Sequence, residues 1–482
     1  MSELELTLGW VARAAGGWLP RGESGRRVGD VVIDSRVIEQ GDLFVALRGP
    51  RFDGHAFVPA VMERGAAGAI VEHGFDFDGA GSDDDVGRAG LDLQTRPDFG
   101  LIEVGDTLQA LQDLATAVRK AAGSKVIAIT GSAGKTTTKE AIAELLSTRF
   151  RVVKNKGNLN NHIGLPLSLM QLRTLPDVAV MELGMNHAGE IRTLVDIAMP
   201  DVRVWTNVGD AHVGFFESPD AIADAKAEIL ERASESTVLV CNADDRRVMD
   251  RVRSFPGRTL TFGMSEGATV RAHDVRDLGI RGMRARVTTP AGEVDMHTPL
   301  LGRGNLANVL AASAVAIDFG IPLEDMVATA ARLTPADRRG AVRPLRDGIT
   351  LIDDSYNSSP SALHRALEVL ALEPEAASKV AVLGEMLELG EHSTRLHQAC
   401  GRAAANAGLR LLVAVGGAPA RALADAAVAG GMPASAVKYF ATSQDAADAI
   451  VGLIHDSDLV LVKGSRGTRT DLVADRLAAE FA

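Results

Sequence analysis

The strongest constraint on the fold is an apolar run at residues 126–130 that leads directly into a short glycine-containing turn and then a segment with helical spacing. The turn and its flanks are Thr130, Gly131, Ser132, Ala133, Gly134, Lys135, Thr136 and Thr137. Backbone N–H groups in such a turn, and the N-terminus of the following helix, can hold phosphate oxygens. We therefore expect a strand, a phosphate loop and a helix, which begin a parallel α/β sheet.

Two side chains give this loop its expected chemistry. Lys135 would lie against the β- and γ-phosphates of a nucleotide, and the Thr136 hydroxyl would coordinate Mg²⁺. The common motif has a further glycine six residues before the lysine, but Ile129 stands there, so the loop is a shortened variant. A glycine-containing turn that binds no ligand is the alternative interpretation.

Strand-length apolar runs recur along the whole chain, with helical stretches between many of them. They lie at residues 31–33, 43–47, 178–181, 202–205, 238–240, 349–352, 380–383, 411–415 and 459–462. A chain of 482 residues exceeds what one hydrophobic core usually serves. We therefore expect three α/β domains: a small N-terminal domain at 1–122, a central doubly wound phosphate-loop domain at 123–340, and a Rossmann-like domain at 341–482.

Charge and composition limit the class of protein. The formal net charge is −12, which argues against a general nucleic-acid binder. No apolar run approaches the roughly 18 residues of a membrane span, Glu3 and Glu5 stand where a secretory signal carries lysines, and Cys241 and Cys400 lie far apart. A soluble cytoplasmic protein fits best. The acidic, glycine-rich stretch at 72–92 reads as a solvated loop.

Polar residues also follow the predicted strands, at the edge where open α/β sheets bind ligands. Glu182, Asn242 and Asp244 each come after such a run, and His212 lies beyond another. From spacing alone, His212 reads first as a surface or hydrogen-bonded histidine, because Mg²⁺ prefers oxygen ligands. Lys226 reads first as a solvated helix lysine.

The assembled residues resemble the Mur ligase family over nearly the whole chain. Residues 130–137 are similar to the family's ATP loop, 181–184 with 207–212 to its metal-binding pair, and 302–305 to its adenine-contacting segment, although the family often has His where Gly304 stands. The resemblance implies ATP and two Mg²⁺ ions, with a lysine carbamylated by CO₂ as one ligand. The implied metal ligands are Thr136, Glu182, His212 and Lys226. The implied nucleotide contacts beyond the loop are Asn305, Asn308, Arg338 and Asp353, and the neighbouring Arg339 leaves the arginine assignment open.

Within the family, residues 157–161, 353–357, 383–390 and 463–466 are similar to the member that adds D-alanyl-D-alanine to a UDP-N-acetylmuramoyl tripeptide. The resemblance implies that the tripeptide carboxylate attacks the γ-phosphate of ATP and that the dipeptide amine captures the acyl phosphate. Lys135, Glu182, His212 and Lys226 would be the catalytic residues. The implied substrate residues are Ser35 and Arg36 in a UDP-sugar domain, then Asn158, Asn160, Asn161, Asp354, Tyr356, Asn357, Lys463 and Arg466.

Several alternatives stay open at this point. Asp353 and Asp354 could cap the following helix, and Arg466 could pair with a surface acid. Folylpolyglutamate synthetase and the Mur ligase that adds the third residue are disfavoured rivals, and two cysteines cannot supply the four-cysteine zinc site of the lipid-linked muramyl amidotransferase subunit. A nucleotide-dependent binding or switch module that performs no ligation is a candidate from another class. We expect a monomer, and the sequence does not distinguish meso-diaminopimelate from L-lysine as the third residue of the tripeptide.

Overall fold

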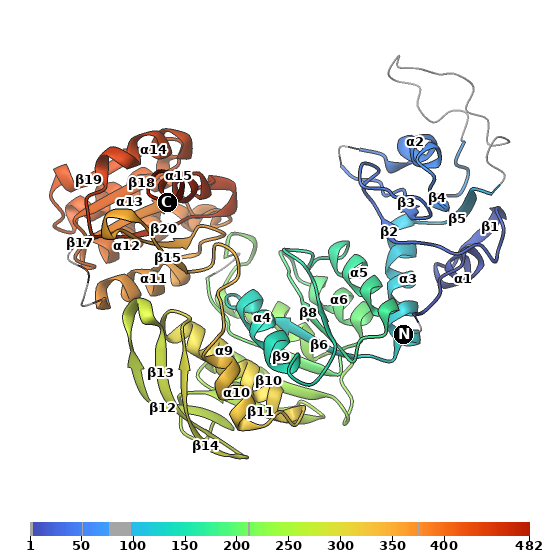
Figure 1. Cartoon of the computed structure of the whole chain (residues 1–482), viewed down its shortest axis with the longest axis horizontal. Coiled ribbons are helices and arrows are strands. Elements are labelled where there is room, and N and C mark those ends of the chain that lie inside the picture. The colour runs from blue at the N-terminus through green and yellow to red at the C-terminus, as the bar shows by residue number, and fades with distance from the viewer. Residues whose placement is uncertain (1–2, 51, 77–97, 211–212, 374–375, 377) are drawn as a thin grey trace. The chain divides into compact units, whose positions relative to one another are not determined.

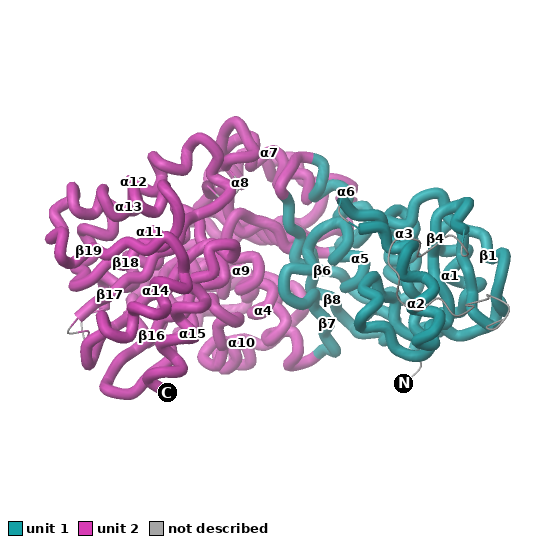
Figure 2. The backbone as a smooth tube through the Cα atoms, turned by 90° about the horizontal axis from the view of Figure 1, so that it is seen from above, with its two compact units in different colours: residues 1–128, 150–185, 189–201 teal, residues 129–149, 186–188, 202–482 magenta. Residues whose placement is uncertain are grey.

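The computed structural model describes residues 3–50, 52–76, 98–210, 213–373, 376 and 378–482. The chain forms two compact units, coloured teal and magenta in Figure 2. The first unit holds residues 1–128, 150–185 and 189–201, and the second holds 129–149, 186–188 and 202–482. Helices alternate with strands in three sheets (Figure 1), which confirms the α/β class.

The first unit begins with a five-stranded sheet in the order β1-β5-β4-β3-β2. Its strands are β1 (Trp18–Arg21), β2 (Val31–Val32), β3 (Leu43–Val45), β4 (Gly68–Glu72) and β5 (Gly100–Val104), and its helices are α1 (Leu8–Ala14), α2 (Val58–Glu63) and α3 (Thr107–Ala122). Strands β2 to β5 are parallel, and β1 is antiparallel to β5. Helix α3 ends at Gly123, whose φ of 67° lies in the left-handed region that glycine adopts without strain.

The nine strands β6 to β14 belong to one sheet, and the boundary between the units falls inside β6 (Lys125–Thr130). The first unit contains β7 (Val152–Lys154), β8 (Val178–Glu182), α5 (Gly164–Leu169) and α6 (Glu190–Ala198). Strands β7 and β8 are parallel. Residues 178–182 are fully buried along β8, as expected for a strand covered on both faces.

In the second unit, the same sheet continues in the order β9-β10-β11-β12-β13-β14. Its elements are α4 (Lys135–Leu146), β9 (Val202–Trp205), α7 (Pro219–Ala227), β10 (Val238–Asn242), α8 (Arg246–Arg251), β11 (Arg258–Gly263), β12 (Val270–Asp277), β13 (Met283–Thr289), β14 (Gly292–Thr298), α9 (Gly302–Asp318) and α10 (Leu323–Ala330). Strands β9 to β12 are parallel, whereas β12, β13 and β14 form antiparallel pairs that the apolar runs did not predict. Buried and exposed residues alternate along β13, so it has no continuous apolar run.

The third sheet, also in the second unit, has the order β15-β16-β20-β17-β18-β19. Its elements are β15 (Ala341–Pro344), β16 (Thr350–Asp354), α11 (Pro360–Leu372), β17 (Ser378–Gly384), α12 (Ser393–Ala405), β18 (Leu411–Val415), α13 (Ala418–Ala429), β19 (Val437–Phe440), α14 (Ser443–Ile450), β20 (Asp458–Lys463) and α15 (Asp471–Glu480). Alternate residues of β17 enter two different cores: Ala381 and Leu383 pack with α11, α12 and α13, and Val380 and Val382 pack with α14 and α15. Helices therefore cover both faces of this sheet, which appears in orange and red in Figure 1.

Several strands run further than predicted. Glu182, Asn242, Asp354 and Lys463 are the last residues of their strands and do not follow them. Asp354 pairs with Lys463 in the register of β16 and β20. Backbone ladder bonds are independent of side-chain polarity, so a search for apolar runs ends a strand too early wherever its last residue is polar.

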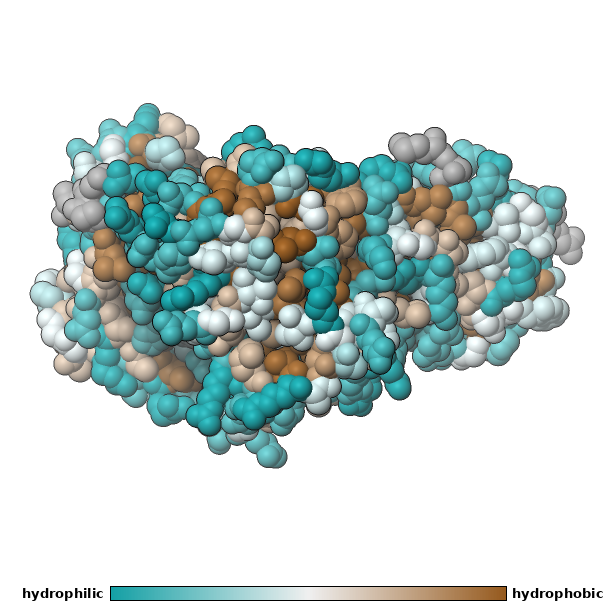
Figure 3. Space-filling model, turned by 90° about the horizontal axis from the view of Figure 1, so that it is seen from below, coloured by the Kyte–Doolittle hydropathy of each residue, from teal (hydrophilic) through white to brown (hydrophobic). Residues whose placement is uncertain are grey.

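Hydrophobic and hydrophilic residues are mixed on the face drawn in Figure 3. Within the described residues, no helix combines the length and apolar character that a bilayer span requires. His212 and most of the acidic stretch at 72–92 lie outside the described residues.

Candidate active site

The phosphate loop connects β6 to α4, and two of its glycines allow close contacts. Gly131 has φ 149° and Gly134 has φ 84°, both positive values that favour glycine. A Cβ on Gly131 would lie 1.9 Å from the Thr206 hydroxyl oxygen, and one on Gly134 would lie 2.2 Å from Asn308 Oδ1. The absence of these two side chains therefore lets the end of β9 and helix α9 approach the loop.

The segment after β9 fixes the loop backbone. Asn207 accepts from the Ala133 N–H through Oδ1 at 3.0 Å and donates to the Ala133 carbonyl through Nδ2 at 2.9 Å. The Thr206 hydroxyl donates to the same carbonyl at 2.8 Å, and the Ser132 N–H donates to the Asn207 carbonyl at 3.0 Å. These bonds tie the loop backbone to the segment after β9.

Lys135 and Thr136 begin helix α4, as the sequence predicts. The Lys135 ammonium donates to the Gly131 carbonyl at 2.9 Å, so its side chain folds back over the loop. Thr136 is buried, whereas Ser132, Ala133 and Thr137 are half-buried. The cationic end of the lysine thus lies at the turn whose N–H groups can hold phosphate oxygens.

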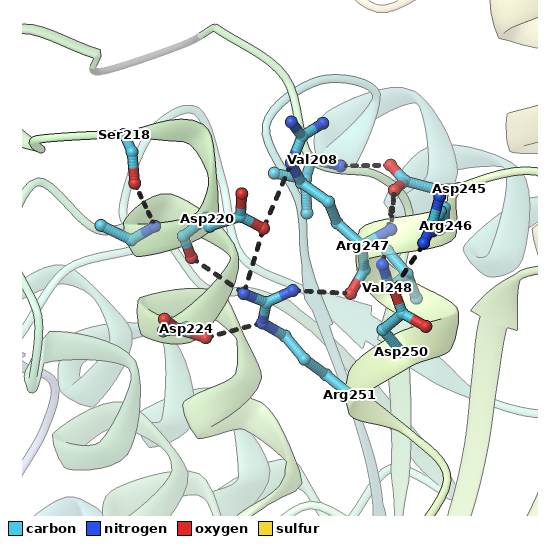
Figure 4. Close-up of polar contacts among 11 residues, drawn as sticks. Val208, Ser218, Asp220, Asp224, Asp245, Arg246, Arg247, Val248, Asp250 and Arg251 are labelled. Carbon is cyan, nitrogen blue, oxygen red and sulfur yellow. Dashed lines mark hydrogen bonds and ion pairs between the residues drawn. The ribbon is translucent and has the colours of Figure 1, made fainter.

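Two further residues support the segment after β9. Asn242 donates through Nδ2 to the Thr206 carbonyl at 2.8 Å. Asp245 caps helix α8 by accepting from the Val248 N–H, and its other oxygen accepts from the Val208 N–H at 2.7 Å (Figure 4). One carboxylate therefore ties α8 to the segment that carries Asn207.

Arg251 joins α8 to α7 next to this support. It donates to Asp224 at 2.7 Å and to the Asp220 carbonyl at 3.1 Å (Figure 4). Both acids are largely exposed, so these ion pairs contribute little to stability.

The segment predicted to contact adenine lies at the start of α9. Asn305 donates to the Leu301 carbonyl at 2.9 Å and accepts from Asn308 Nδ2 at 3.1 Å. Asn308 is buried against Gly134. The structure thus brings Asn308 to the phosphate loop and Asn305 to Asn308.

Lys226 is not the solvated helix lysine that its spacing suggested. It is 2% exposed at the end of α7. Burial lowers the pKa of Lys226 well below its ordinary value, and the charge of Lys135 lowers it further. No carboxylate among the described residues offsets these two effects, so the side chain is a candidate for a neutral amine.

Glu182 lies in the first unit and is also buried. Its carboxylate accepts from Asn160 Nδ2 at 2.9 Å. Asn155, which is 1% exposed, donates to the Glu182 carbonyl at 3.1 Å and accepts from its N–H at 3.0 Å. Asn155 was not predicted, and nothing in its sequence context distinguishes it from a loop residue.

Of the four residues predicted to hold Mg²⁺, the structure describes Thr136, Glu182 and Lys226. Across the described ranges, no group of three His, Cys, Asp or Glu side chains is placed to hold a metal. The described candidates carry one hydroxyl in Thr136 and one carboxylate in Glu182. A hydroxyl and a carboxylate are each oxygen donors of the kind that Mg²⁺ takes, and the ion usually keeps several waters and binds one or two protein carboxylates together with substrate phosphates.

Asp353 holds the turn after β16. It is fully buried, accepts from the Ser355 hydroxyl at 2.6 Å and forms an ion pair with Arg343 at 3.4 Å. Helix α11 begins at Pro360 with Ser359 before it, so Asp353 and Asp354 do not cap it.

Asp354 and Lys463 pair with each other. The Lys463 ammonium donates to Asp354 at 2.7 Å and to the Asn357 carbonyl at 3.0 Å. Lys463 is buried, whereas Asn357 is exposed. Two residues predicted to hold the dipeptide therefore neutralise one another.

Two arginines lie against Tyr356. The guanidinium carbon of Arg339 is 4.1 Å from the ring centroid, and that of Arg466 is 5.8 Å from it. No acid in the described part of the chain pairs with Arg466, which excludes that alternative there. Arg338 instead pairs with Asp475 at 3.0 Å and lies 3.9 Å from Asp471.

The remaining predicted substrate residues lie in the first unit. Arg36 is exposed and pairs with Asp34 at 2.7 Å, and this hydrogen-bonded pair lowers the pKa of Asp34 to about 2. The Ser35 carbonyl accepts from Arg64 at 2.9 Å. Asn161 accepts from the Gly164 N–H at 2.8 Å at the start of α5, and Asn158 is exposed.

Three family models match the chain in succession. They are described as the Mur ligase family catalytic domain at residues 27–119, the Mur ligase middle domain at 129–316, and the Mur ligase glutamate ligase domain at 338–466. Together they match most of its length. The chain belongs to the Mur ligase family.

Named relatives and solved structures within the family are similar over nearly full length. The UDP-N-acetylmuramoyl-tripeptide–D-alanyl-D-alanine ligase of Bacillus subtilis is 32% identical, with 93% of this chain and 92% of the relative covered. A crystal structure of MurF from Acinetobacter baumannii has 32% identity and a TM-score of 0.85, covering 99% of this chain and 100% of that one. MurF from Thermotoga maritima in complex with ADP has 28% identity and a TM-score of 0.77, covering 94% and 97%.

Proposed function

We propose that this chain is an ATP-dependent ligase that joins D-alanyl-D-alanine to a UDP-N-acetylmuramoyl tripeptide in peptidoglycan precursor synthesis. The observation that carries the proposal is the phosphate loop, held by Asn207 and Thr206 with the Lys135 ammonium over it. The full-length similarity to ligases named for this reaction supports the choice of substrates.

The reaction has two balanced steps. An oxygen of the tripeptide carboxylate forms a bond to the γ-phosphorus of ATP while the bond to ADP breaks and ADP leaves with the electron pair. The neutral amine of the dipeptide then attacks the acyl carbon, phosphate leaves, and the nitrogen loses a proton. Because an anion must approach a triphosphate, positioning and positive charge carry most of the catalysis.

Lys135 is the protein cation best placed for this task, since its ammonium already lies over the loop. Mg²⁺, when bound, neutralises developing charge on the phosphate oxygens. We assign Thr136, Glu182, His212 and carbamylated Lys226 as its ligands, with two ions in the family pattern.

The buried position of Lys226 supports carbamylation. A neutral amine attacks CO₂, forms an N–C bond and releases a proton, and the lowered pKa of Lys226 favours that neutral form. The carbamate would supply oxygen ligands. Lys226→Ala should lose activity that acetate partly restores, whereas full activity without acetate would make Lys226 a structural residue.

For the nucleotide, we assign Asn305, Asn308 and Arg339, together with the loop residues 130–137. Arg338 is engaged by acids, which favours its neighbour for this role. Asp353 is predicted to contribute through the turn it stabilises, because its own carboxylate is buried.

For the dipeptide, we assign Arg466 to the free carboxylate and Tyr356 and Asn357 to its surroundings. Asp354 and Lys463 then act as a pair that shapes this region. Ser35, Arg36, Asn158, Asn160 and Asn161 are assigned to the UDP-linked substrate. The three proposed functional regions are residues 1–122, 123–340 and 341–482, and we expect a cytoplasmic monomer.

The direct test measures ADP release with each UDP-tripeptide, with and without D-alanyl-D-alanine. Stoichiometric ADP that depends on both substrates is expected, with D-alanine alone a poor acceptor. ADP release that does not depend on the dipeptide would favour a nucleotide-dependent switch. Ligation of a third amino acid to a UDP-dipeptide would favour the Mur ligase that adds the third residue.

A further inference from the structure

Arg365 is a cation that the assigned reaction does not yet use. It lies in the second turn of α11 and is exposed to solvent. Among the described residues, it forms no ion pair or hydrogen bond with a protein group. An arginine without a protein partner has all its donors available to a ligand.

The side chain of Arg365 lies across Gly304 at the start of α9. A Cβ on Gly304 would be 3.2 Å from Arg365 Cδ and 3.3 Å from Nε. The missing side chain at position 304 therefore leaves the space through which Arg365 extends.

Contacts on both helices point from Arg365 toward the phosphate loop. Gly304 and Asn308 lie one turn apart on the same side of α9, and Asn308 packs against Gly134 of the loop. On α11, Ser361 lies one turn before Arg365, and its hydroxyl would be 3.3 Å from a Cβ on Gly209.

Gly209 in turn borders the loop itself, since the Ser132 hydroxyl donates to the Gly209 carbonyl at 3.3 Å. The faces of α9 and α11 that meet at Arg365 thus both continue to the phosphate loop. An extended arginine side chain spans about one helical turn, so its guanidinium can reach a group bound there.

Protein packs around the Arg365 guanidinium, and the charges of three acids act on it. Desolvation by the surrounding protein lowers the pKa of Arg365, while the charges of Glu368, Asp354 and Asp210 act in the opposite direction. The arginine keeps its charge, and part of its side chain is exposed to solvent. None of these acids is close enough to form an ion pair with it.

We propose that Arg365 binds a β- or γ-phosphate oxygen of the ATP held by the phosphate loop. This inference rests on the proposed function, since it requires the loop to hold a nucleotide. Guanidinium groups form charge-assisted hydrogen bonds to phosphate. The absence of a side chain at Gly304 leaves room for the Arg365 side chain to extend.

The test measures the dissociation constant of a non-hydrolysable ATP analogue by calorimetry, and that of AMP by competition. Variants are Arg365→Ala, Arg365→Lys, Lys135→Ala and the matched control Arg402→Ala, an exposed arginine on α12. We expect Arg365→Ala to weaken the ATP analogue about 10-fold or more, Arg365→Lys to retain part of that affinity, and AMP binding to be unchanged.

Two results would overturn the inference: equal affinity of Arg365→Ala and Arg402→Ala for the ATP analogue, or equal weakening of ATP analogue and AMP by Arg365→Ala. Lys135→Ala separates this failure from failure of the proposed function. If Lys135→Ala loses affinity and Arg365→Ala does not, only the assignment of Arg365 fails. If neither variant loses affinity, the nucleotide assignment of the loop fails as well.

Discussion

The phosphate loop and the paired ends of β16 and β20 both carry polar residues in the second unit, but their polar groups are satisfied in different ways. In the loop, side chains from a neighbouring segment bind the backbone, as Asn207 binds Ala133. At the strand ends, charged side chains bind one another, as Lys463 binds Asp354.

The residues around the loop therefore position backbone groups that can bind a ligand, whereas the strand-end residues stabilise the protein by binding one another. The loop bonds fix the backbone through the N–H groups of Ser132 and Ala133, and the N-terminus of α4, which can hold phosphate oxygens, follows directly. The two charges of the strand-end pair neutralise one another, whereas Arg466 and Arg339 lie against Tyr356 without an acid partner among the described residues. Substitutions in the two regions should therefore affect different measurable quantities.

The largest effect is expected for Lys135→Ala. Loss of one preorganised charge contact costs about 3 kcal/mol or more of transition-state stabilisation. Ligation should fall by orders of magnitude while the unfolding midpoint stays close to that of the wild type, and Lys120→Ala on α3 provides a charge-matched control. Near-normal turnover in Lys135→Ala would contradict a catalytic role for the phosphate loop.

Asn207→Ala tests the preparation of the loop. It removes both side-chain bonds to Ala133, and unsatisfied buried groups cost about 1–3 kcal/mol. We expect weaker nucleotide binding and a lower kcat/KM for ATP. Asn406→Ala, which removes one exposed bond to Arg402, should change neither. Equal behaviour of the two variants would show that the loop does not need this support.

A double-mutant cycle on Asp354 and Lys463 tests the strand-end pair. Each single substitution leaves one charge without its partner, so the two effects should not add, with a coupling of about 1–3 kcal/mol. The measurement is the free energy of unfolding of Asp354→Ala, Lys463→Met and the double variant. Additive effects would mean that the pair contributes no stability and that both groups are available to substrate.

Arg466→Ala should separate the dipeptide from the nucleotide. We expect the apparent KM for D-alanyl-D-alanine to rise about 10-fold, since a charged hydrogen bond is lost, while the KM for ATP changes little. Arg476→Ala on α15 is the control. A rise in the KM for ATP alone would move Arg466 to the nucleotide site.

The smallest effect concerns His397, which is buried and bonded to the backbone of Met386. Its Nε2 accepts from the Met386 N–H at 2.9 Å, and its Nδ1 donates to the Ser393 carbonyl at 2.8 Å. Burial lowers the pKa of His397 below its ordinary 6.5. The unfolded chain therefore takes up the proton first, and stability that is complete above pH 6.5 is lost as the pH falls toward the folded pKa.

Unfolding measured across this pH range should show the loss in the wild type and a smaller one in His397→Gln, whose amide can make both bonds without titrating. An identical pH dependence in the two proteins would mean that His397 titrates with the same pKa in the folded and unfolded states.

Much of the fold follows from the sequence because parallel strands buried on both faces form continuous apolar runs, as in β8 and β18. Strand β13 was missed because only one of its faces is buried. The last residues of β16 and β20 were placed outside their strands because polar side chains hide the ends of the hydrogen-bonded ladder.

The phosphate loop could be predicted because its chemistry is local in sequence. Its supports could not, since Asn207 and Asp245 act across separate elements. Burial of Lys226 depends on surrounding structure that a polar helical pattern does not reveal. Arg365 was missed for a similar reason: its relevance depends on Gly304, sixty-odd positions away in the chain, leaving it room.

The central claim, that a carboxylate attacks ATP held at the phosphate loop, has a direct isotopic test. The tripeptide is prepared with a heavy oxygen isotope in its terminal carboxylate, and the inorganic phosphate released during ligation of D-alanyl-D-alanine is analysed by mass spectrometry. One labelled oxygen in each phosphate is expected, because the acyl phosphate carries it from the carboxylate. Ligation that releases unlabelled phosphate would contradict the account.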